Sequence, residues 1–202
     1  MSSNKKVIGL VGKLQSGKTT SAKIILDYYK KDYNIICKYS FADLLKSMIL
    51  NAGICNAEEL WGNKTEFSRL MLQKIGTEII RKQVSEDFWA HKMSLKISET
   101  FSDSPDENIL IVIDDVRFLN EAKLINVFNG KLIRIKRPSL EVTKDENKHL
   151  SETEQDGILV EHDIINDGSL DDLKEKIINI LKSLETNSWI LTFYLIIPHI
   201  LY

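Results

Sequence analysis

A chain of 202 residues with 43% hydrophobic and 28% charged residues has the composition of a globular protein whose single domain can bury a sizeable core. Its net charge of −2 argues against nucleic acid as a partner, because polyanions are usually bound by an excess of Lys and Arg. Two cysteines are too few for a disulfide framework or a zinc site, and the N-terminal "MSSNKK" lacks an apolar signal-peptide core. We therefore expect an intracellular, cytoplasmic protein.

The first element expected is a short buried strand over 7–11, which leads directly into "GKLQSGKT" at 12–19. This is the spacing of a phosphate-binding loop, in which backbone N–H groups and a helix N-terminus converge on phosphate oxygens. Lys18 would reach the outer phosphates, and the Thr19 hydroxyl would face a magnesium ion. The helix that follows has one apolar face, formed by Ala22, Ile25, Leu26 and Tyr29.

Apolar runs and helical periodicity alternate through the rest of the chain. Further strands are predicted over 34–40, 109–113, 131–136 and 162–166. Helices are predicted over 41–53, 66–83, 86–101, 119–128 and 169–184. The charged stretch 137–161 predicts a surface segment inserted between strands. Together these elements predict an α/β fold, a three-layer sandwich with a five-stranded parallel sheet that binds its ligand at the carboxyl ends of the strands.

The apolar stretch "WILTFYLIIPHILY" at 189–202 is oddly placed after the polar "ETNS". Its 14 residues, interrupted by Pro198, fall short of the roughly 20 that a membrane-spanning helix needs. We favour core packing or partner contact, ahead of a disordered or non-native extension, with a membrane anchor last. The expected organisation is one domain over 1–185 and an apolar tail over 186–202.

The stretch "IDDVRF" at 113–118 places carboxylates at the end of a buried strand. Asp114 or Asp115 could hold magnesium there, directly or through water, although aspartates are also common in solvated turns. Arg117 is two residues past Asp115, so its guanidinium could grip a phosphate in the same crevice. Glu121 lies one helical turn beyond Arg117.

Resemblance to a known family adds what spacing alone does not show. It is carried by six motifs in this order: "GKLQSGKTT", "SFADLLK", "LMLQKIGTEIIRK…DFW", "DDVRFLNEA", "HLSE" and "INDGSLDDL". The chain resembles the deoxynucleoside monophosphate kinases of bacteriophages and other viruses, from about Val7 to about Leu181. The resemblance implies a P-loop fold like that of nucleoside monophosphate kinases, with a lid at about 137–161. It also implies ATP and Mg²⁺ as cofactors and transfer of a phosphoryl group to a deoxynucleoside monophosphate, in the host cytoplasm if the chain is viral.

The resemblance assigns residues motif by motif. The segment that binds the ATP phosphates corresponds to Lys13, Gly17, Lys18, Thr19 and Thr20. The segment lining the acceptor nucleotide corresponds to Phe41, Ala42 and Asp43. Contacts with the acceptor's base and sugar correspond to Gly76, Thr77, Arg81 and Trp89, and the remaining acceptor contacts to Asp115, Arg117 and Glu121. Trp89 could equally be a core residue of an amphipathic helix.

The lid implied by the resemblance contains Arg137, Lys148 and His149, which could close over the triphosphate and exclude water. His149 could equally be a surface residue. Catalysis would depend on Lys18, Arg117, Arg137 and Mg²⁺, which position the phosphates and stabilise their charge. A general base is not needed, because a phosphate acceptor is already anionic.

Other functions remain open at this stage. Phosphomevalonate kinases share a similar "SFA…LK" segment and an Asp-x-Arg after the third strand, although Trp89 and Phe41 favour a nucleobase. A GTPase-like switch is a weaker alternative, because "NKTE" at 63–66 has Glu66 where a guanine-reading motif has Asp. A non-catalytic nucleotide binder is a further alternative. The residues leave open the preferred base, the choice between deoxy- and ribonucleotide, a homodimer, and the role of the tail.

Overall fold

The computed structural model describes residues 3–138 and 154–196, and the side chains of these up to residue 186. The strands are β1 (Lys5–Val11), β2 (Ile35–Tyr39), β3 (Ile109–Val116), β4 (Lys131–Lys136) and β5 (His162–Ile165). The α-helices are α1 (Lys18–Tyr29), α2 (Phe41–Asn51), α3 (Ala57–Trp61), α4 (Glu66–Gln73), α5 (Phe88–Asp103), α6 (Leu119–Val127) and α8 (Leu170–Ile196). A π-helix, η1 (Lys74–Val84), and a short 3-10 helix, η3 (Glu154–Gly157), complete the described elements.

The five strands form one parallel sheet in the order β2-β3-β1-β4-β5, which confirms the predicted sheet. β1, whose end leads into the phosphate loop, lies at the centre. The apolar run of β3 is buried along its length, as expected of a parallel strand covered on both faces. Because carboxyl ends of parallel strands lie at one edge, the loops that follow β1, β3 and β4 meet there.

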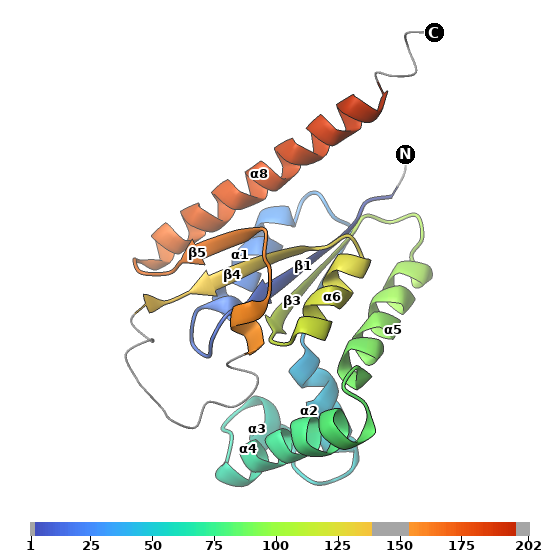
Figure 1. Cartoon of the computed structure of the whole chain (residues 1–202), viewed down its shortest axis with the longest axis vertical. Coiled ribbons are helices and arrows are strands. Elements are labelled where there is room, and N and C mark those ends of the chain that lie inside the picture. Colours follow the sequence, from blue (N-terminus) through green and yellow to red (C-terminus); the bar gives the residue numbers. More distant parts are fainter. Residues whose placement is uncertain (1–2, 139–153, 197–202) are drawn as a thin grey trace.

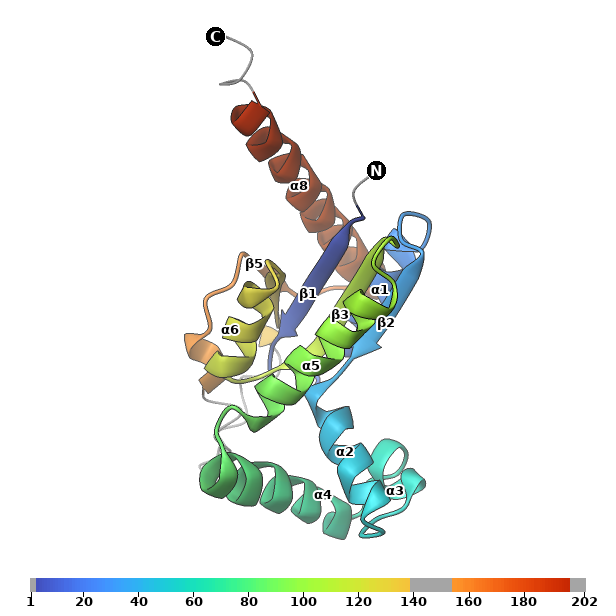
Figure 2. The same ribbon diagram turned by 90° about the vertical axis from the view of Figure 1, so that its right-hand side faces the viewer.

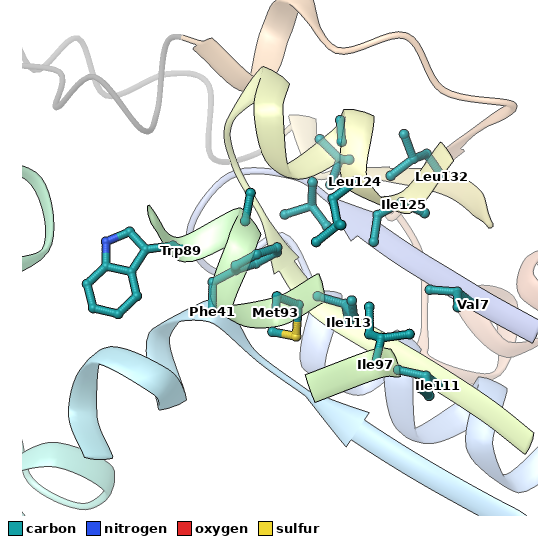
Figure 3. Packing of buried hydrophobic residues seen from close by; sticks show 14 of the residues in the cluster. Val7, Phe41, Trp89, Met93, Ile97, Ile111, Ile113, Leu124, Ile125 and Leu132 are labelled. Atoms are coloured by element: carbon teal, nitrogen blue, oxygen red, sulfur yellow. The ribbon is translucent and has the colours of Figure 1, made fainter. Parts of the chain in front are cut away.

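Helices cover both faces of the sheet, which gives the predicted three layers (Figure 1). On one face, α1 and α8 pack on a cluster that includes Leu10, Val112 and Ile133. On the other face, α5 and α6 pack on a second cluster, shown in Figure 3, that includes Ile111 and Ile113. Burial of these apolar side chains is the main source of stability, at about 25 cal/mol per Å² removed from water.

A small helical layer lies beyond the carboxyl ends of the strands. It consists of α2, α3, α4 and η1, and Figure 2 shows it below the tip of β1. Its own apolar cluster is formed by Ile49, Cys55 and Leu60, which are all buried. This layer therefore covers the edge of the sheet at which the fold predicts a ligand.

Two elements of this layer differ from the sequence prediction. The chain forms α3 within a stretch for which no element was predicted, and the Asn56 side chain caps it by accepting a hydrogen bond from the Glu59 N–H. The single helix predicted over 66–83 is instead an α-helix followed by the π-helix η1. Long π-helices are rare, and π-type turns occur frequently at functional sites.

The C-terminal part also differs in extent from the prediction. Helix α8 continues to Ile196, beyond the helix predicted over 169–184 and into the segment treated as a tail. Within residues 3–138 and 154–196, no helix combines the length and hydrophobicity needed to cross a membrane. Most of the predicted lid, including Lys148 and His149, lies outside the described residues.

Candidate active site

The phosphate loop owes its shape to backbone conformations that glycine adopts easily. Gly12 and Gly17 have φ angles of 151° and 107°, and Gln15 adopts a left-handed φ of 60°. A Cβ atom on Gly12 would press against the Ile135 carbonyl and lie 2.7 Å from the Ser16 hydroxyl. Any side chain at position 12 would therefore distort the loop, as the sequence pattern predicts.

The loop presents the groups that bind a phosphate. Lys18 is 8% exposed, and its ammonium donates hydrogen bonds to the carbonyls of Gly12 and of Lys13, the latter at 2.7 Å. The Ser16 hydroxyl is buried and has no hydrogen-bond partner among the described residues. The first turn of α1 contains no acidic residue and no side-chain cap, so its N–H groups can donate hydrogen bonds to an anion. Thr19 and Thr20 are exposed in that turn.

Asn166, which directly follows β5, connects the phosphate loop to β4 by hydrogen bonds. Its side-chain amide donates to the Ser16 carbonyl at 2.9 Å, and its backbone N–H donates to the Lys136 carbonyl at 2.7 Å. A Cβ on Gly17 would lie 2.6 Å from that amide nitrogen, so the absence of a side chain permits the contact. Sequence reasoning missed this residue, although it belongs to the quoted motif "INDGSLDDL".

The two aspartates predicted at the end of β3 serve different neighbours. The register between β1 and β3 shifts there: Gly9 pairs with Ile113 but Val11 pairs with Val116. Such an extra residue re-aims the side chains around it. Asp115 accepts hydrogen bonds from the Ser40 hydroxyl at 2.6 Å and from the N–H groups of Phe41 and Ala42 at 2.8 and 2.9 Å, and so caps α2. Burial raises the pKa of Asp115, although these hydrogen bonds favour the ionised form and lower it.

Asp114 faces a cation instead. Its side chain is 8% exposed, and Oδ2 lies 3.2 Å from the Lys38 Nζ on β2. In the described part of the chain, no group of three or more His, Cys, Asp or Glu side chains is arranged to hold a metal ion. A nucleotide-bound Mg²⁺ needs fewer protein ligands, since it usually takes one or two and fills its shell with phosphate and water. Thr19 and Asp114 together fit such an ion. Asp115 fits it less well, because its carboxylate already accepts hydrogen bonds from the start of α2.

A pocket of about 190 Å³ lies between the helical layer and the end of β3. It brings together every predicted acceptor residue except Asp43. These residues are Phe41, Ala42, Gly76, Thr77, Arg81, Trp89, Asp115, Arg117 and Glu121. The lining also includes Leu45, Leu72, Gln73 and Phe118, which the sequence reasoning did not single out.

The π-helix η1 forms one wall of this pocket. Gly76 and Thr77 face it, and a Cβ on Gly76 would lie 2.6 Å from a methyl group of Leu45 on α2. The indole N–H of Trp89 donates to the Gly76 carbonyl at 3.0 Å, which ties α5 to η1. Trp89 is 6% exposed and stands at the margin of the core in Figure 3, next to Phe41. It is therefore both a core residue and part of the pocket wall.

A buried ion pair forms the floor of the pocket. Arg81 and Glu121 are 6% and 3% exposed and are joined at 2.8 Å, and the Arg81 guanidinium lies 3.6 Å from the centre of the Phe118 ring. The other Glu121 oxygen accepts hydrogen bonds from the N–H groups of Arg117 and Phe118, which fixes the start of α6. Burial raises the pKa of Glu121 to about 7, although the charge of Arg81 lowers it.

Asp43 lies outside the pocket lining. Its carboxylate accepts hydrogen bonds from the Lys46 ammonium and the Trp61 indole N–H, both at 2.9 Å. These contacts tie α2 to α3. The acceptor role assigned to Asp43 by resemblance therefore has no direct counterpart in the pocket.

Cations gather near the acceptor pocket. Burial lowers the pKa of Lys64, and the positive charges of Lys46, Arg69 and Arg117 lower it further. These positive charges repel one another, and an anion bound between them would relieve that repulsion. Sequence reasoning assigned the acceptor phosphate to Arg117 alone and missed the cations of the helical layer.

A second pocket, of about 230 Å³, lies beside the phosphate loop. Its lining combines loop residues with the end of β4 and with η3: Gly12, Lys13, Ser16, Arg134, Ile135, Lys136, Arg137, Gln155 and Asp156. Arg134 donates to the carbonyl groups of Gln155 and Ile158, which holds η3 against β4. The predicted residues Lys13 and Arg137 thus share one pocket next to the loop.

We predict that Glu121→Gln removes a pH dependence of stability. Between the ordinary pKa of 4.5 and about 7, folded Glu121 retains a proton that the unfolded chain has lost. The unfolding free energy of the wild type should therefore fall as pH rises through this range, by up to about 3 kcal/mol more than that of the variant. Urea unfolding followed by tryptophan fluorescence at pH 5, 6 and 7 measures this, with the exposed Glu99→Gln as control. Parallel curves for wild type and Glu121→Gln would contradict the assignment.

The sequence is similar to those of known kinases. The deoxynucleotide monophosphate kinase family matches residues 53–177, more than half of the chain. A relative in Acanthamoeba polyphaga mimivirus, named for that activity, is 30% identical over 166 residues, which are 73% of this chain and 81% of the relative. The deoxynucleotide monophosphate kinase of Escherichia phage RB69 is 26% identical over 147 residues, and this chain spans 54% of its length.

A solved structure agrees with the architecture. The gluconokinase of Sinorhizobium meliloti 1021 superposes with a TM-score of 0.51 at 11% identity, over 92% of this chain and 97% of that one. This likeness concerns the fold alone. The family match and the mimivirus relative confirm the resemblance expected from the six motifs: the chain belongs to the deoxynucleotide monophosphate kinase family.

Proposed function

We propose that the protein transfers the γ-phosphoryl group of ATP to a deoxynucleoside monophosphate in a reaction supported by Mg²⁺, and so supplies diphosphates for nucleotide biosynthesis. The observation that carries this proposal is the placement of a phosphate loop and an aromatic, cationic pocket on either side of Asp114 and Asp115. Membership of the family supports it independently. The reaction takes place in the cytoplasm, of the host if the source is a virus.

On the donor side, Lys13, Gly17, Lys18, Thr19 and Thr20 hold the ATP phosphates. The narrow cradle at Gly12 and the buried Ser16 hydroxyl fit a phosphate there. Thr19 and Asp114 would hold the Mg²⁺, which would neutralise charge on the phosphates. Arg137, at the base of the lid, lies beside the loop and can stabilise the transferred group. His149 lies outside the described residues, so its role stays a prediction.

On the acceptor side, the base enters between apolar and aromatic walls. Phe41, Leu45, Leu72 and Trp89 line that part of the pocket, and offset or edge-on contact with rings suits any base. Arg117 grips the acceptor phosphate from the end of β3. The positively charged Lys46, Lys64 and Arg69 add attraction for an anionic ligand.

The chemistry follows from this placement. An oxygen of the acceptor phosphate attacks the γ-phosphorus, the bond to the β–γ bridging oxygen breaks, and ADP leaves as the diphosphate forms. The acceptor oxygen is already anionic, so the protein needs no general base. Lys18, Arg117 and Arg137 hold the two substrates in line and balance the charge on the transferred group.

The pocket lining favours this function over phosphomevalonate phosphorylation. A branched aliphatic acceptor needs cations and little aromatic surface, whereas Trp89, Phe41 and Phe118 all line the cavity. The partner is therefore a small nucleotide and not a nucleic acid, in keeping with the net charge of −2. We propose no protein partner, and a homodimer stays open.

We predict that Arg117→Ala separates the two substrates. A charge-assisted hydrogen bond to phosphate is lost, so KM for the deoxynucleoside monophosphate should rise about 10- to 100-fold. The dissociation constant of ATP should stay within about twofold, because Arg117 lies on the acceptor side. Steady-state kinetics and equilibrium ATP binding measure the two values, with the exposed Lys123→Ala on α6 as the charge-matched control. Equal losses for both substrates would count against this role.

Asn166→Asp should give the opposite pattern. The substitution keeps the shape of the side chain but places a carboxylate against the Ser16 carbonyl, where the amide now donates at 2.9 Å. We expect the affinity for ATP to fall about tenfold while KM for the acceptor changes little. Asn126→Asp, an exposed change of the same kind on α6, controls for the added charge. Unchanged ATP binding in Asn166→Asp would show that the loop does not depend on this contact.

A further inference from the structure

Asp114 is a buried carboxylate whose charge is balanced by Lys38. Only 8% of the Asp114 side chain is exposed, and the Lys38 ammonium lies 3.2 Å from its Oδ2. Burying a carboxylate without a partner is costly, and removing one member of a buried pair is more destabilising than the pair is worth. The ion pair with Lys38 therefore offsets the cost of burying the Asp114 carboxylate.

The pair lies on the donor face of the sheet. Ile36 and Val112 pack on the apolar cluster under α1 and α8, and Lys38 follows Ile36 by two residues, as Asp114 follows Val112. Residues two apart in a strand share a face. Lys38 and Asp114 therefore lie on the face covered by α1, the helix that begins at the phosphate loop.

We propose that Lys38 is a positioning residue that competes with Mg²⁺ for the Asp114 carboxylate and is displaced when the metal arrives with the nucleotide. This inference rests on the proposed function, because it takes Asp114 as a metal ligand. A divalent cation bound to the carboxylate would lie close to the ammonium, and the repulsion between them disfavours holding both. The apparent affinity for Mg²⁺ is then lowered by the fraction of molecules in which Lys38 occupies Asp114.

Lys38 has room to move and another acid to move toward. Its side chain is 38% exposed, so part of it is free of packing. Burial opposes ionisation of Asp43, but Lys46, Trp61 and Lys38 together lower its pKa, so the field of Lys38 already reaches that carboxylate. Asp43 is on α2, the helix that also carries the pocket residues Phe41 and Leu45. The displaced ammonium would remain next to the acceptor side without leaving the site.

The test is a Mg²⁺ titration of fluorescent mant-ATP binding to the full chain, with every variant measured at the same pH of about 8. Lys38→Met removes the competing charge and keeps an unbranched side chain. The Mg²⁺ concentration at half saturation should fall about two- to fivefold relative to wild type. Lys38→Arg retains the charge and should restore the wild-type value. Lys174→Met, an exposed change on α8, controls for the loss of one positive charge.

A double variant makes the result specific. Asp114→Asn should raise the half-saturating Mg²⁺ concentration, and adding Lys38→Met to Asp114→Asn should change nothing further. If Lys38→Met matches the Lys174→Met control while Asp114→Asn weakens Mg²⁺, the competition is overturned and the donor site stands. If Asp114→Asn has no effect on Mg²⁺, both the competition and the metal role of Asp114 are overturned.

Discussion

The end of β3 is the constraint on which both halves of the site depend. Asp114 and Asp115 are adjacent, yet one faces Lys38 on the α1 side of the sheet and the other caps α2 on the opposite side. Adjacent residues in a strand are only about 3.3 Å apart along its axis. The backbone therefore fixes the spacing between the carboxylate on the donor face and the carboxylate on the acceptor face. Because every residue of β3 except Asp115 is buried, this spacing cannot easily relax.

The two halves are built in different ways. The phosphate loop joins a central strand to a regular helix and is held from behind by Asn166, so its shape is fixed before any ligand binds. The acceptor pocket uses a π-helix, a buried ion pair and a tryptophan that spans core and cavity. Buried ionic groups rarely add net stability, which suits Arg81 and Glu121 to a role in shaping the pocket. Stability comes from the apolar clusters on the two faces of the sheet.

Much of this architecture was predictable because its signals are local. Apolar runs located the five strands, and the glycine spacing at 12–19 located the phosphate loop. The α-to-π change at Lys74 was not predictable, since apolar spacing hardly distinguishes the two helices over such a short stretch. Helix α3 was missed because five residues are too few to show a period.

Contacts between distant parts of the chain were beyond sequence reasoning. Asn166 reaches Ser16 across 150 positions, and Lys38 reaches Asp114 across 76. Both contacts depend on the parallel sheet, which pairs β2 with β3 and places the carboxyl ends of β1 and β5 at the same edge. The residues that resemblance assigned to the acceptor line one pocket, with the exception of Asp43, which is hydrogen-bonded to Lys46 and Trp61 instead. Their role toward the acceptor stays a prediction.

The most direct test of the central claim is product analysis after incubation of the protein with ATP, Mg²⁺ and single acceptors. The acceptors are the deoxy- and ribonucleoside monophosphates and phosphomevalonate, and Lys18→Ala is the inactive control. We predict that one or more deoxynucleoside monophosphates are converted to diphosphates, with one ADP formed per product and no turnover by Lys18→Ala. Turnover with phosphomevalonate alone, or with none of the acceptors, would contradict the account.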